Sequence, residues 1–526
     1  MITGVLRAFL ILLVCSVSLF LKAQDTAMYN VLHYDIHVKV EPNKEYISGY
    51  NTILCRVQKT SDVLFFDLVP DMKVNKIVVD SNELLYFRKQ NKVIATLKKT
   101  VSAGDVIAMK VYFEGKPLKA KLAPWNGGFD WKTDNNNKPW VGLACESKGA
   151  AIWLPCKDDW SDEPESMDMY LSVPDTLVGI SNGRLKEVSK DNGYATYHWQ
   201  VINPINNYNI SINVGDYVHI SDTFYGINKL SLDYYVLRSN VEKARRHFKE
   251  VDTMLRAFEH YFGAYPFPED GYKLVETPYW GMEHQSCVAY GNKYRYNEYG
   301  FDFIIVHESG HEWFANSITA ADPADMWIHE SFTTYSEALF VEYTQGEAKA
   351  LAYLQMQRDK VVNQHPMQGP RHQNYHGWKD NDIYYKGSWV LQTLRYSVNN
   401  DSLWFKTLRE YSTTFRHQLI QTEDVISFFN KRLPGISKEV FYQYLNHASL
   451  PVLAVAVKTI KGKQVLEYQW MADRPNFKLN LQVPSAVGTV VLKAGKGKQR
   501  VKVPQGFSIE DVMKLKEVAL IEIGRL

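Results

Sequence analysis

The chain has 526 residues, of which 45% are hydrophobic and 22% are charged. This composition is typical of globular proteins, and the length is too great for a single hydrophobic core. The formal net charge of +2 at pH 7 lacks the basic excess that favours binding to nucleic acids or acidic membranes, so we expect neither as a partner.

The first 23 residues have the pattern of a signal peptide. Arg7 supplies a positive charge, residues 8–21 form an apolar core, and residues 21–23 resemble a small-residue cleavage site. The apolar run is shorter than a transmembrane helix needs, although a retained signal anchor is the alternative. We therefore expect a mature chain that begins near Gln24, is secreted or periplasmic, and has no stable insertion in a membrane.

Four cysteines follow the predicted signal peptide, at positions 55, 145, 156 and 287. So few thiols in so long a chain do not form a disulfide framework, and their spacing does not match that of metal ligands. Cys145 and Cys156 are near each other in sequence, and whether they pair is left open at this point.

Residues 24–219 are predicted to form a mainly antiparallel β domain. Apolar residues alternate with polar ones from Tyr34 to Val40, which indicates a strand with one buried face. Similar short runs recur, separated by turns such as Asn192-Gly193, and no long helical period appears.

Residues 220–446 are predicted to form a helix-rich domain with a small sheet. Apolar residues recur at helical spacing from Val241 to Tyr261, and Gly263 ends that pattern. The segment from Tyr272 to Tyr290 is typical of extended chain. Further helical patterns cover residues 301–316, 329–345, 346–362, 386–398 and 402–445.

Residues 447–526 return to strand patterns, with alternation from Leu453 to Val457 and from Phe477 to Val483. A short capped helix is predicted near Ser508. We expect a small β-sandwich here. The predicted fold class is therefore multidomain α+β, with an N-terminal antiparallel β domain, a helix-rich central domain and a C-terminal β-sandwich.

The strongest functional motif is HESGH at positions 307–311, inside a predicted helix. Two histidines four residues apart lie on one helix face, so His307 and His311 can bind the same zinc ion. Glu330, which eighteen residues separate from His311, is the expected third protein ligand. Three protein ligands leave one position open, as in catalytic zinc sites, and we expect one zinc ion per chain.

Glu308 follows the first histidine and is expected to lie close to the metal, where it takes a proton from a water molecule. The alternative is an ordinary pair of surface histidines. The apolar flanks, residues 303–306 and 313–314, argue against it because they predict a mostly buried helix. Buried histidines and glutamates need partners, and a metal supplies one.

These motifs resemble the thermolysin-like (gluzincin) zinc aminopeptidase family of aminopeptidase N and the leukotriene-processing hydrolase. The resemblance spans nearly the whole mature chain and keeps the family's order of motifs. Its other parts are Glu146 with residues 153–156, the stretch 262–268, Gly281-Met282-Glu283 and residues 384–387. The resemblance implies a thermolysin-like catalytic domain and an enzyme that removes the N-terminal residue from peptides with a free N-terminus.

The resemblance also implies roles for individual residues. Glu283 would hold the substrate's α-ammonium group by a charge-assisted hydrogen bond, with Gly281 and Met282 beside it in the substrate site. Glu146 is a second candidate anchor for the amine. Tyr384 would donate to the developing oxyanion opposite the zinc, and its neighbour Tyr385 is the rival for that role.

The chain departs from the family pattern at several positions. Trp280 stands in place of the first glycine of the exopeptidase motif, His284 and His329 replace asparagines, and Gly310 replaces an alanine. Trp280 would narrow the substrate cleft. The chain also ends after the small β domain, where many members continue with a helical domain, so the resemblance implies a short member with a more open site.

Two other functions fit parts of the sequence. One is a zinc endopeptidase, which Glu283 argues against because an endopeptidase has no use for an amine anchor that closes the cleft. The other is a catalytically silent peptide-binding protein, which Glu308 and Tyr384 argue against because both chemical groups are present. The leading prediction is a zinc metallo-aminopeptidase.

Overall fold

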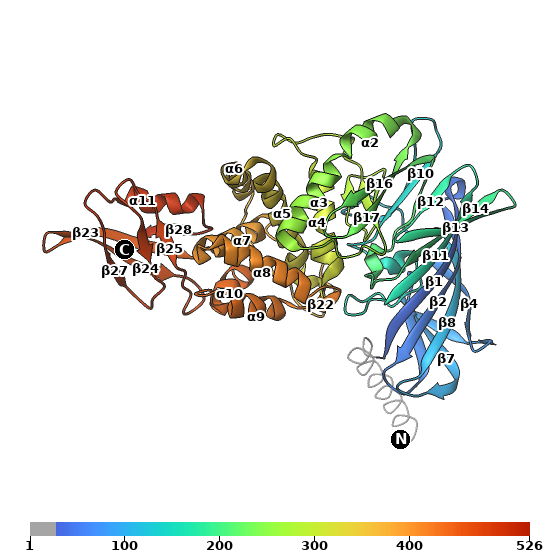
Figure 1. Cartoon of the computed structure of the whole chain (residues 1–526). Coiled ribbons are helices and arrows are strands. Elements are labelled where there is room, and N and C mark those ends of the chain that lie inside the picture. Colours follow the sequence, from blue (N-terminus) through green and yellow to red (C-terminus); the bar gives the residue numbers. More distant parts are fainter. Residues whose placement is uncertain (1–27) are drawn as a thin grey trace, which may run out of the picture. The chain divides into compact units, whose positions relative to one another are not determined.

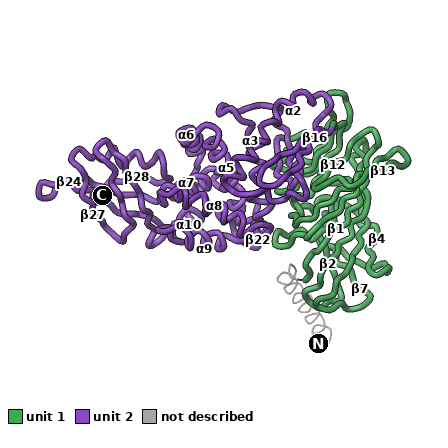
Figure 2. Tube along the Cα trace, in the orientation of Figure 1, with its two compact units in different colours: residues 1–218, 277–279 green, residues 219–276, 280–526 purple. Residues whose placement is uncertain are grey.

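The computed structural model of the chain describes residues 28–526, so the predicted signal peptide lies outside the described residues. The chain folds as two compact units (Figure 2). The first contains the described residues up to Val218 and Thr277–Tyr279, and the second contains His219–Glu276 and Trp280–Leu526. Within residues 28–526, none of the helices has the length and apolarity needed to span a membrane.

The first unit is rich in β-strands, as predicted (Figure 1). An eight-stranded sheet has the order β13-β14-β11-β1-β2-β8-β4-β5, and smaller sheets have the orders β12-β15-β10-β9 and β3-β7-β6. The strands are β1 (Tyr29–Glu41), β2 (Tyr46–Val57), β3 (Ser61–Asp67), β4 (Met72–Val79), β5 (Asn82–Glu83), β6 (Tyr86–Lys89), β7 (Lys92–Val101), β8 (Val106–Gly115), β9 (Gly128–Thr133), β10 (Pro139–Ala144), β11 (Ser166–Pro174), β12 (Val178–Ile180), β13 (Arg184–Asp191), β14 (Tyr194–Val201) and β15 (Asn213–Gly215).

Every second side chain along β11 is buried, so the alternation of the sequence faces the core. The Asn192-Gly193 turn joins β13 to β14, and both residues have positive φ, as a two-residue hairpin turn requires. The pairing is mainly antiparallel, as predicted, although β1 and β11 run parallel in the large sheet. The four cysteines are buried free thiols, so Cys145 and Cys156 do not pair in this structure.

The second unit begins with a sheet in the order β16-β17-β18-β20-β19, followed by helices. The strands are β16 (Tyr217–Tyr225), β17 (Lys229–Leu237), β18 (Tyr272–Glu276), β19 (Gly281–Met282), β20 (Val288–Tyr290), β21 (Ile318–Ala320) and β22 (Gln418–Ile420). The helices are α2 (Val241–His247), α3 (Glu250–Phe262), α4 (Phe303–Gly310), α5 (Trp327–Gln345), α6 (Glu347–Arg358), α7 (Tyr385–Val398), α8 (Asp401–Thr414), α9 (Thr422–Arg432) and α10 (Lys438–Asn446).

Helix α5 is the central element of this unit. Its side chains are buried from Trp327 to Val341, and it packs against α4, α6 and α7. The sequence pattern predicts one helical stretch over residues 402–445. The structure instead has three helices there, α8, α9 and α10, with β22 between the first two.

The C-terminal strands belong to the second unit and form a four-stranded sheet, β27-β24-β23-β28, and a two-stranded sheet, β25-β26. The guanidinium of Arg358 on α6 donates to the carbonyls of Lys516, Ala519 and Ile521, which ties this region to the helices. The elements are β23 (Val452–Ile460), β24 (Lys463–Met471), β25 (Leu481–Val483), β26 (Val490–Leu492), β27 (Gln499–Lys502), α11 (Ile509–Met513) and β28 (Glu522–Arg525). The predicted capped helix near Ser508 is α11, which begins with a capping box.

Candidate metal centre and active site

The HESGH motif lies on α4 and the residue that follows it. Asp302 caps the helix by accepting from the backbone N–H groups of Ile304 and Ile305. Of the apolar residues that precede the motif, Ile304, Ile305 and Val306 are buried, as their pattern predicted, and Phe303 is half-buried. After His311 the chain turns sharply through Glu312–Ser317, where Phe314 and Ala315 have non-helical backbone angles.

Helix α5 brings Glu330 to the two histidines because it packs closely against α4. A Cβ atom at Gly310 would lie 2.8 Å from the Ser336 hydroxyl oxygen and 3.1 Å from a methyl carbon of Thr333, both on α5. The glycine that replaces the family's alanine therefore fits a tight helix–helix contact, which offsets its lower helix propensity.

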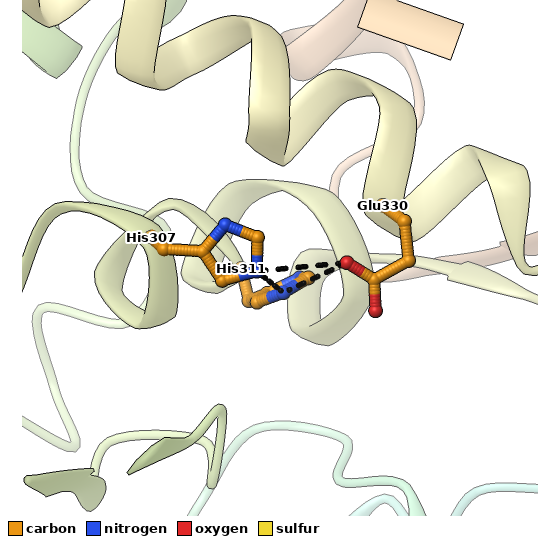
Figure 3. Close-up of side chains that lie close together, drawn as sticks. All are labelled: His307, His311 and Glu330. Atoms are coloured by element: carbon orange, nitrogen blue, oxygen red, sulfur yellow. Dashed lines mark hydrogen bonds and ion pairs between the residues drawn. The ribbon is translucent and has the colours of Figure 1, made fainter. Parts of the chain in front are cut away.

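The three predicted ligands form a compact triangle (Figure 3). The Nε2 atoms of His307 and His311 are 3.3 Å apart. Oε2 of Glu330 lies 3.6 Å from the first and 3.5 Å from the second. Ligand bonds of about 2.0–2.2 Å in tetrahedral geometry give ligand-to-ligand distances of about 3.3–3.6 Å. The triangle therefore fits one face of a tetrahedral zinc site.

The other ring nitrogens of both histidines already have partners. Nδ1 of His307 lies 2.7 Å from Oε1 of Glu337, and Nδ1 of His311 lies 3.0 Å from the carbonyl oxygen of Phe314. An Nδ1–H that donates to these oxygens leaves Nε2 with its lone pair toward the triangle. These Nδ1 contacts orient each imidazole with its Nε2 toward the triangle, as a metal ligand requires.

The electrostatics of the centre favour a cation. Oε2 of Glu330 is buried without a hydrogen-bond partner. Burial by itself lowers the pKa of His307, but the carboxylates of Glu330 and Glu337 outweigh it and raise that pKa well above its usual value. Burial and the same two carboxylates raise the pKa of Glu308 to about 7, against the opposing effect of His307. A bound divalent cation would relieve this excess of negative charge.

Glu308 and Glu283 lie next to the triangle. Carboxylate oxygens of both residues and a ring nitrogen of His311 are within 4.8 Å of one another. A Cβ atom at Gly281 would lie 2.5 Å from Oε1 of Glu308, so only glycine leaves room for this carboxylate. Met282 is buried and pairs with Ala289 across β19 and β20. Gly281 and Met282 thus lie on an edge strand beside Glu308.

Tyr384 directly precedes α7, and its ring stacks on that of His307, with centroids 6.2 Å apart. The Ser331 hydroxyl, one residue after Glu330, donates to the carbonyl of Ile383. A Cβ atom at Gly387 would lie 1.7 Å from the same hydroxyl oxygen. This close contact between α5 and α7 holds the Tyr384 backbone near the histidines.

His329, His284 and Glu146, which the sequence analysis also named, lie outside the triangle of candidate ligands. Nε2 of His329 accepts from the backbone N–H of Ala320, and burial lowers the pKa of His329 and of His284 to about 3, which keeps both imidazoles neutral. Neither belongs to a metal-capable cluster among residues 28–526. Glu146 lies in the first unit, just after β10, and its role stays a prediction.

Glu337 contacts a candidate metal ligand but is not among the residues predicted from the sequence. It lies seven residues after Glu330 on α5, so the helical spacing places both carboxylates on one face and could have revealed it. Its Oε2 accepts from the hydroxyl of Tyr353 at 2.5 Å and from the side-chain amide of Gln357 at 3.2 Å. These bonds fix the carboxylate that orients His307.

Replacing Glu337 by glutamine is expected to weaken zinc binding about tenfold, at the lower end of the effects seen for partners of metal-bound histidines. The amide oxygen still accepts from His307 but lacks the negative charge. Competition with a chelator measures the affinity. Glu347→Gln, at an exposed position on α6, is the control, and equal zinc affinity of both variants and the unmodified protein would contradict the role of Glu337.

Two family models match the chain. The Peptidase M1 N-terminal domain matches residues 30–208, and the Peptidase family M1 domain matches residues 247–444. The second match contains the three candidate ligands, Glu283, Glu308 and Tyr384.

Curated relatives are similar at low identity. Aminopeptidase B of Rattus norvegicus is 24% identical over 384 residues, which are 66% of this chain and 56% of the relative. Leucyl aminopeptidase of Saccharolobus solfataricus is 21% identical over 460 residues, 83% of this chain and 56% of the relative. Aminopeptidase N of Bos taurus is 23% identical over 424 residues, which are 72% of this chain and 42% of the relative. The chain thus spans about half the length of the curated relatives it matches.

Solved structures share the fold. The M1 zinc metallopeptidase from Deinococcus radiodurans superposes with a TM-score of 0.68 at 20% identity, covering 81% of this chain and 95% of the other. A mutant of that protein, bound to a Tyr-Ser-Ala substrate, gives the same TM-score at 21% identity, with 81% and 96% covered.

Proposed function

Because the chain belongs to peptidase family M1, we propose that it is a zinc-dependent aminopeptidase that removes the N-terminal residue from peptides. The observation that carries this proposal is the Glu283 carboxylate beside Glu308 and His311. A carboxylate at this place suits a substrate ammonium group, whereas an internal peptide segment has no positive charge to offer it.

His307, His311 and Glu330 are the residues that would hold the zinc ion. Bound there, zinc would act as a Lewis acid that makes a water molecule more acidic and polarises the scissile carbonyl. Three observations support this assignment: the geometry of the triangle, the Glu330 oxygen that has no hydrogen-bond partner, and the Nδ1 contacts that orient both histidines.

Glu308 is the proposed general base. Its carboxylate is buried beside the triangle and is not one of the three ligands, so it is available to take a proton from the attacking water. The same group then gives the proton to the leaving amine. Gly281 supports this role. A side chain at position 281 would occupy the space that the Glu308 carboxylate fills.

The remaining roles concern substrate charge. Glu283 holds the α-ammonium group, and Met282 and Gly281 lie beside it, while Glu146 in the first unit is the proposed second anchor. The hydroxyl of Tyr384 donates to the oxygen that becomes negative as the carbonyl is attacked. The stacking of Tyr384 on His307 favours it over Tyr385, whose ring is 5.0 Å from the ammonium of Lys360.

Residues 1–23 support an exported protein, so the proposed substrates are peptides outside the cytoplasm.

A comparison of two substrates tests the proposal. Cleavage of a leucyl substrate with a free amine is expected to exceed that of its N-acetylated form at least about thirtyfold, because acetylation removes the positive charge that the Glu283 carboxylate would bind. Released leucine or N-acetylleucine measures both rates. Equal rates would favour the endopeptidase alternative, and no cleavage of either substrate by the zinc-loaded protein would favour the silent binding protein.

A further inference from the structure

A row of stacked rings leads from the metal centre along α4. The ring of Phe303 lies 5.1 Å from that of His307 at an interplanar angle of 19°. The ring of Trp280 lies 5.4 Å from Phe303 at 18°. The indole N–H of Trp280 donates to the side-chain oxygen of Asn292 at 3.2 Å, which fixes the orientation of the ring. Trp280 nevertheless keeps 42% of its surface exposed.

We infer that Trp280 and Phe303 form a binding surface for an aromatic side chain of the substrate, on the leaving-group side of the scissile bond. The inference rests on the proposed aminopeptidase function and names its substrate class, which is peptides with Phe, Tyr or Trp at the second or third position. Trp280 stands where the family motif has its first glycine.

The direction of the substrate follows from the two ends of α4. Glu283 lies near His311, at the end of the helix, and Phe303 is its first residue. His311 follows Phe303 by eight positions, which is about 12 Å along the helix at 1.5 Å per residue. Glu308 lies between them. A peptide with its amine at Glu283 and its first carbonyl near Glu308 therefore continues toward the Phe303 end.

The edge strand points the same way. β19 is an edge strand of its sheet. Trp280 directly precedes this strand and Glu283 directly follows it. A peptide that adds to such an edge in the antiparallel sense, with its N-terminus at Glu283, runs toward Trp280. Each extended residue spans at most about 3.3–3.6 Å, so its second and third residues reach the indole.

The chemistry of this surface selects aromatic side chains. Trp280 is a large, exposed ring whose orientation is already fixed, so little conformational entropy is lost when a substrate ring packs on it. Aromatic pairs gain stability from offset or edge-to-face packing beyond the area they bury. An alanine in the same substrate position gains neither effect.

Three tripeptides test the inference: Leu-Ala-Ala, Leu-Phe-Ala and Leu-Ala-Phe. Leucine release by the zinc-loaded full chain gives kcat/KM for each. We expect one of the two phenylalanine peptides to exceed Leu-Ala-Ala about tenfold. In Trp280→Ala this ratio is expected to fall to near one, and Trp280→Phe, which keeps a ring, retains part of it.

Tyr225→Ala is the matched control, because Tyr225 is an exposed aromatic residue on β16 of the same unit, with 67% of its surface accessible. It should keep the ratio of the unmodified protein. Thermal unfolding shows whether each variant is folded. If Trp280→Ala does not fold, the ratio of kcat/KM between the phenylalanine peptides and Leu-Ala-Ala in the unmodified protein still tests the inference.

The outcomes separate the two proposals. Leucine release at equal kcat/KM from all three peptides would overturn the aromatic subsite and leave the aminopeptidase proposal standing. A tenfold preference that persists in Trp280→Ala would also overturn it. No leucine release from any peptide would contradict the proposed function, and the subsite with it.

Discussion

Replacing Glu308 by glutamine is expected to lower kcat by about 10²–10⁴-fold while the chain still binds one zinc ion. Glutamine has nearly the same size and shape but cannot accept a proton from water, and general bases typically contribute rate effects of this size. Zinc binding should persist because the triangle of His307, His311 and Glu330 does not include Glu308. Leucine release measures kcat, and metal analysis of the purified variant measures the zinc content.

A second buried glutamate provides the control. Glu312 follows His311, and its Oε1 accepts from the backbone N–H of Ser286 at 2.7 Å. Glu312→Gln keeps an acceptor for that bond and should retain most of the activity. If Glu308→Gln loses zinc as well as turnover, the residue holds the metal centre together. If it keeps normal turnover with zinc bound, another group is the base.

The sequence predicted the metal centre because its main signal is local. The i,i+4 spacing of His307 and His311 on one helix, with apolar flanks, determines which side chains share a face. The class of fold was also predictable, since period-two and period-3.6 patterns distinguish the β-rich part from the helical part. The capped helix α11 and the Asn192-Gly193 hairpin are further local features that the structure contains.

What the sequence could not predict depends on contacts between distant elements. The parallel pairing of β1 with β11 leaves no mark on alternation, because both kinds of pairing share the same period. Residues 402–445 keep a helical period across breaks, so α8, α9 and α10 looked continuous. The need for glycine at position 281 becomes visible only when the Glu308 carboxylate is placed against it. The seven-residue spacing places Glu337 on the same face of α5 as Glu330, but its contact with His307 is visible only when α4 is packed against α5.

Replacing Tyr384 by phenylalanine is expected to lower kcat about 10²–10³-fold with little change in KM or zinc content. The lost hydroxyl is a donor that acts on charge developing in the transition state, and removing one such donor has effects of this size in other hydrolases. An interaction made only in the transition state lowers kcat and kcat/KM equally. The ring itself, which stacks on His307, remains in the variant, so the surroundings of the metal ligand are preserved.

Tyr385→Phe separates this role from that of the neighbouring tyrosine. The ring of Tyr385 faces the ammonium of Lys360 rather than the histidines, so loss of its hydroxyl should change kcat only slightly. A large loss in Tyr385→Phe with normal turnover in Tyr384→Phe would transfer the donor role to Tyr385. A raised KM with unchanged kcat in Tyr384→Phe would instead indicate a contact already made with the bound substrate, because loss of uniform binding raises KM at constant kcat. The split between kcat and KM therefore distinguishes a transition-state donor from a substrate contact at the same position.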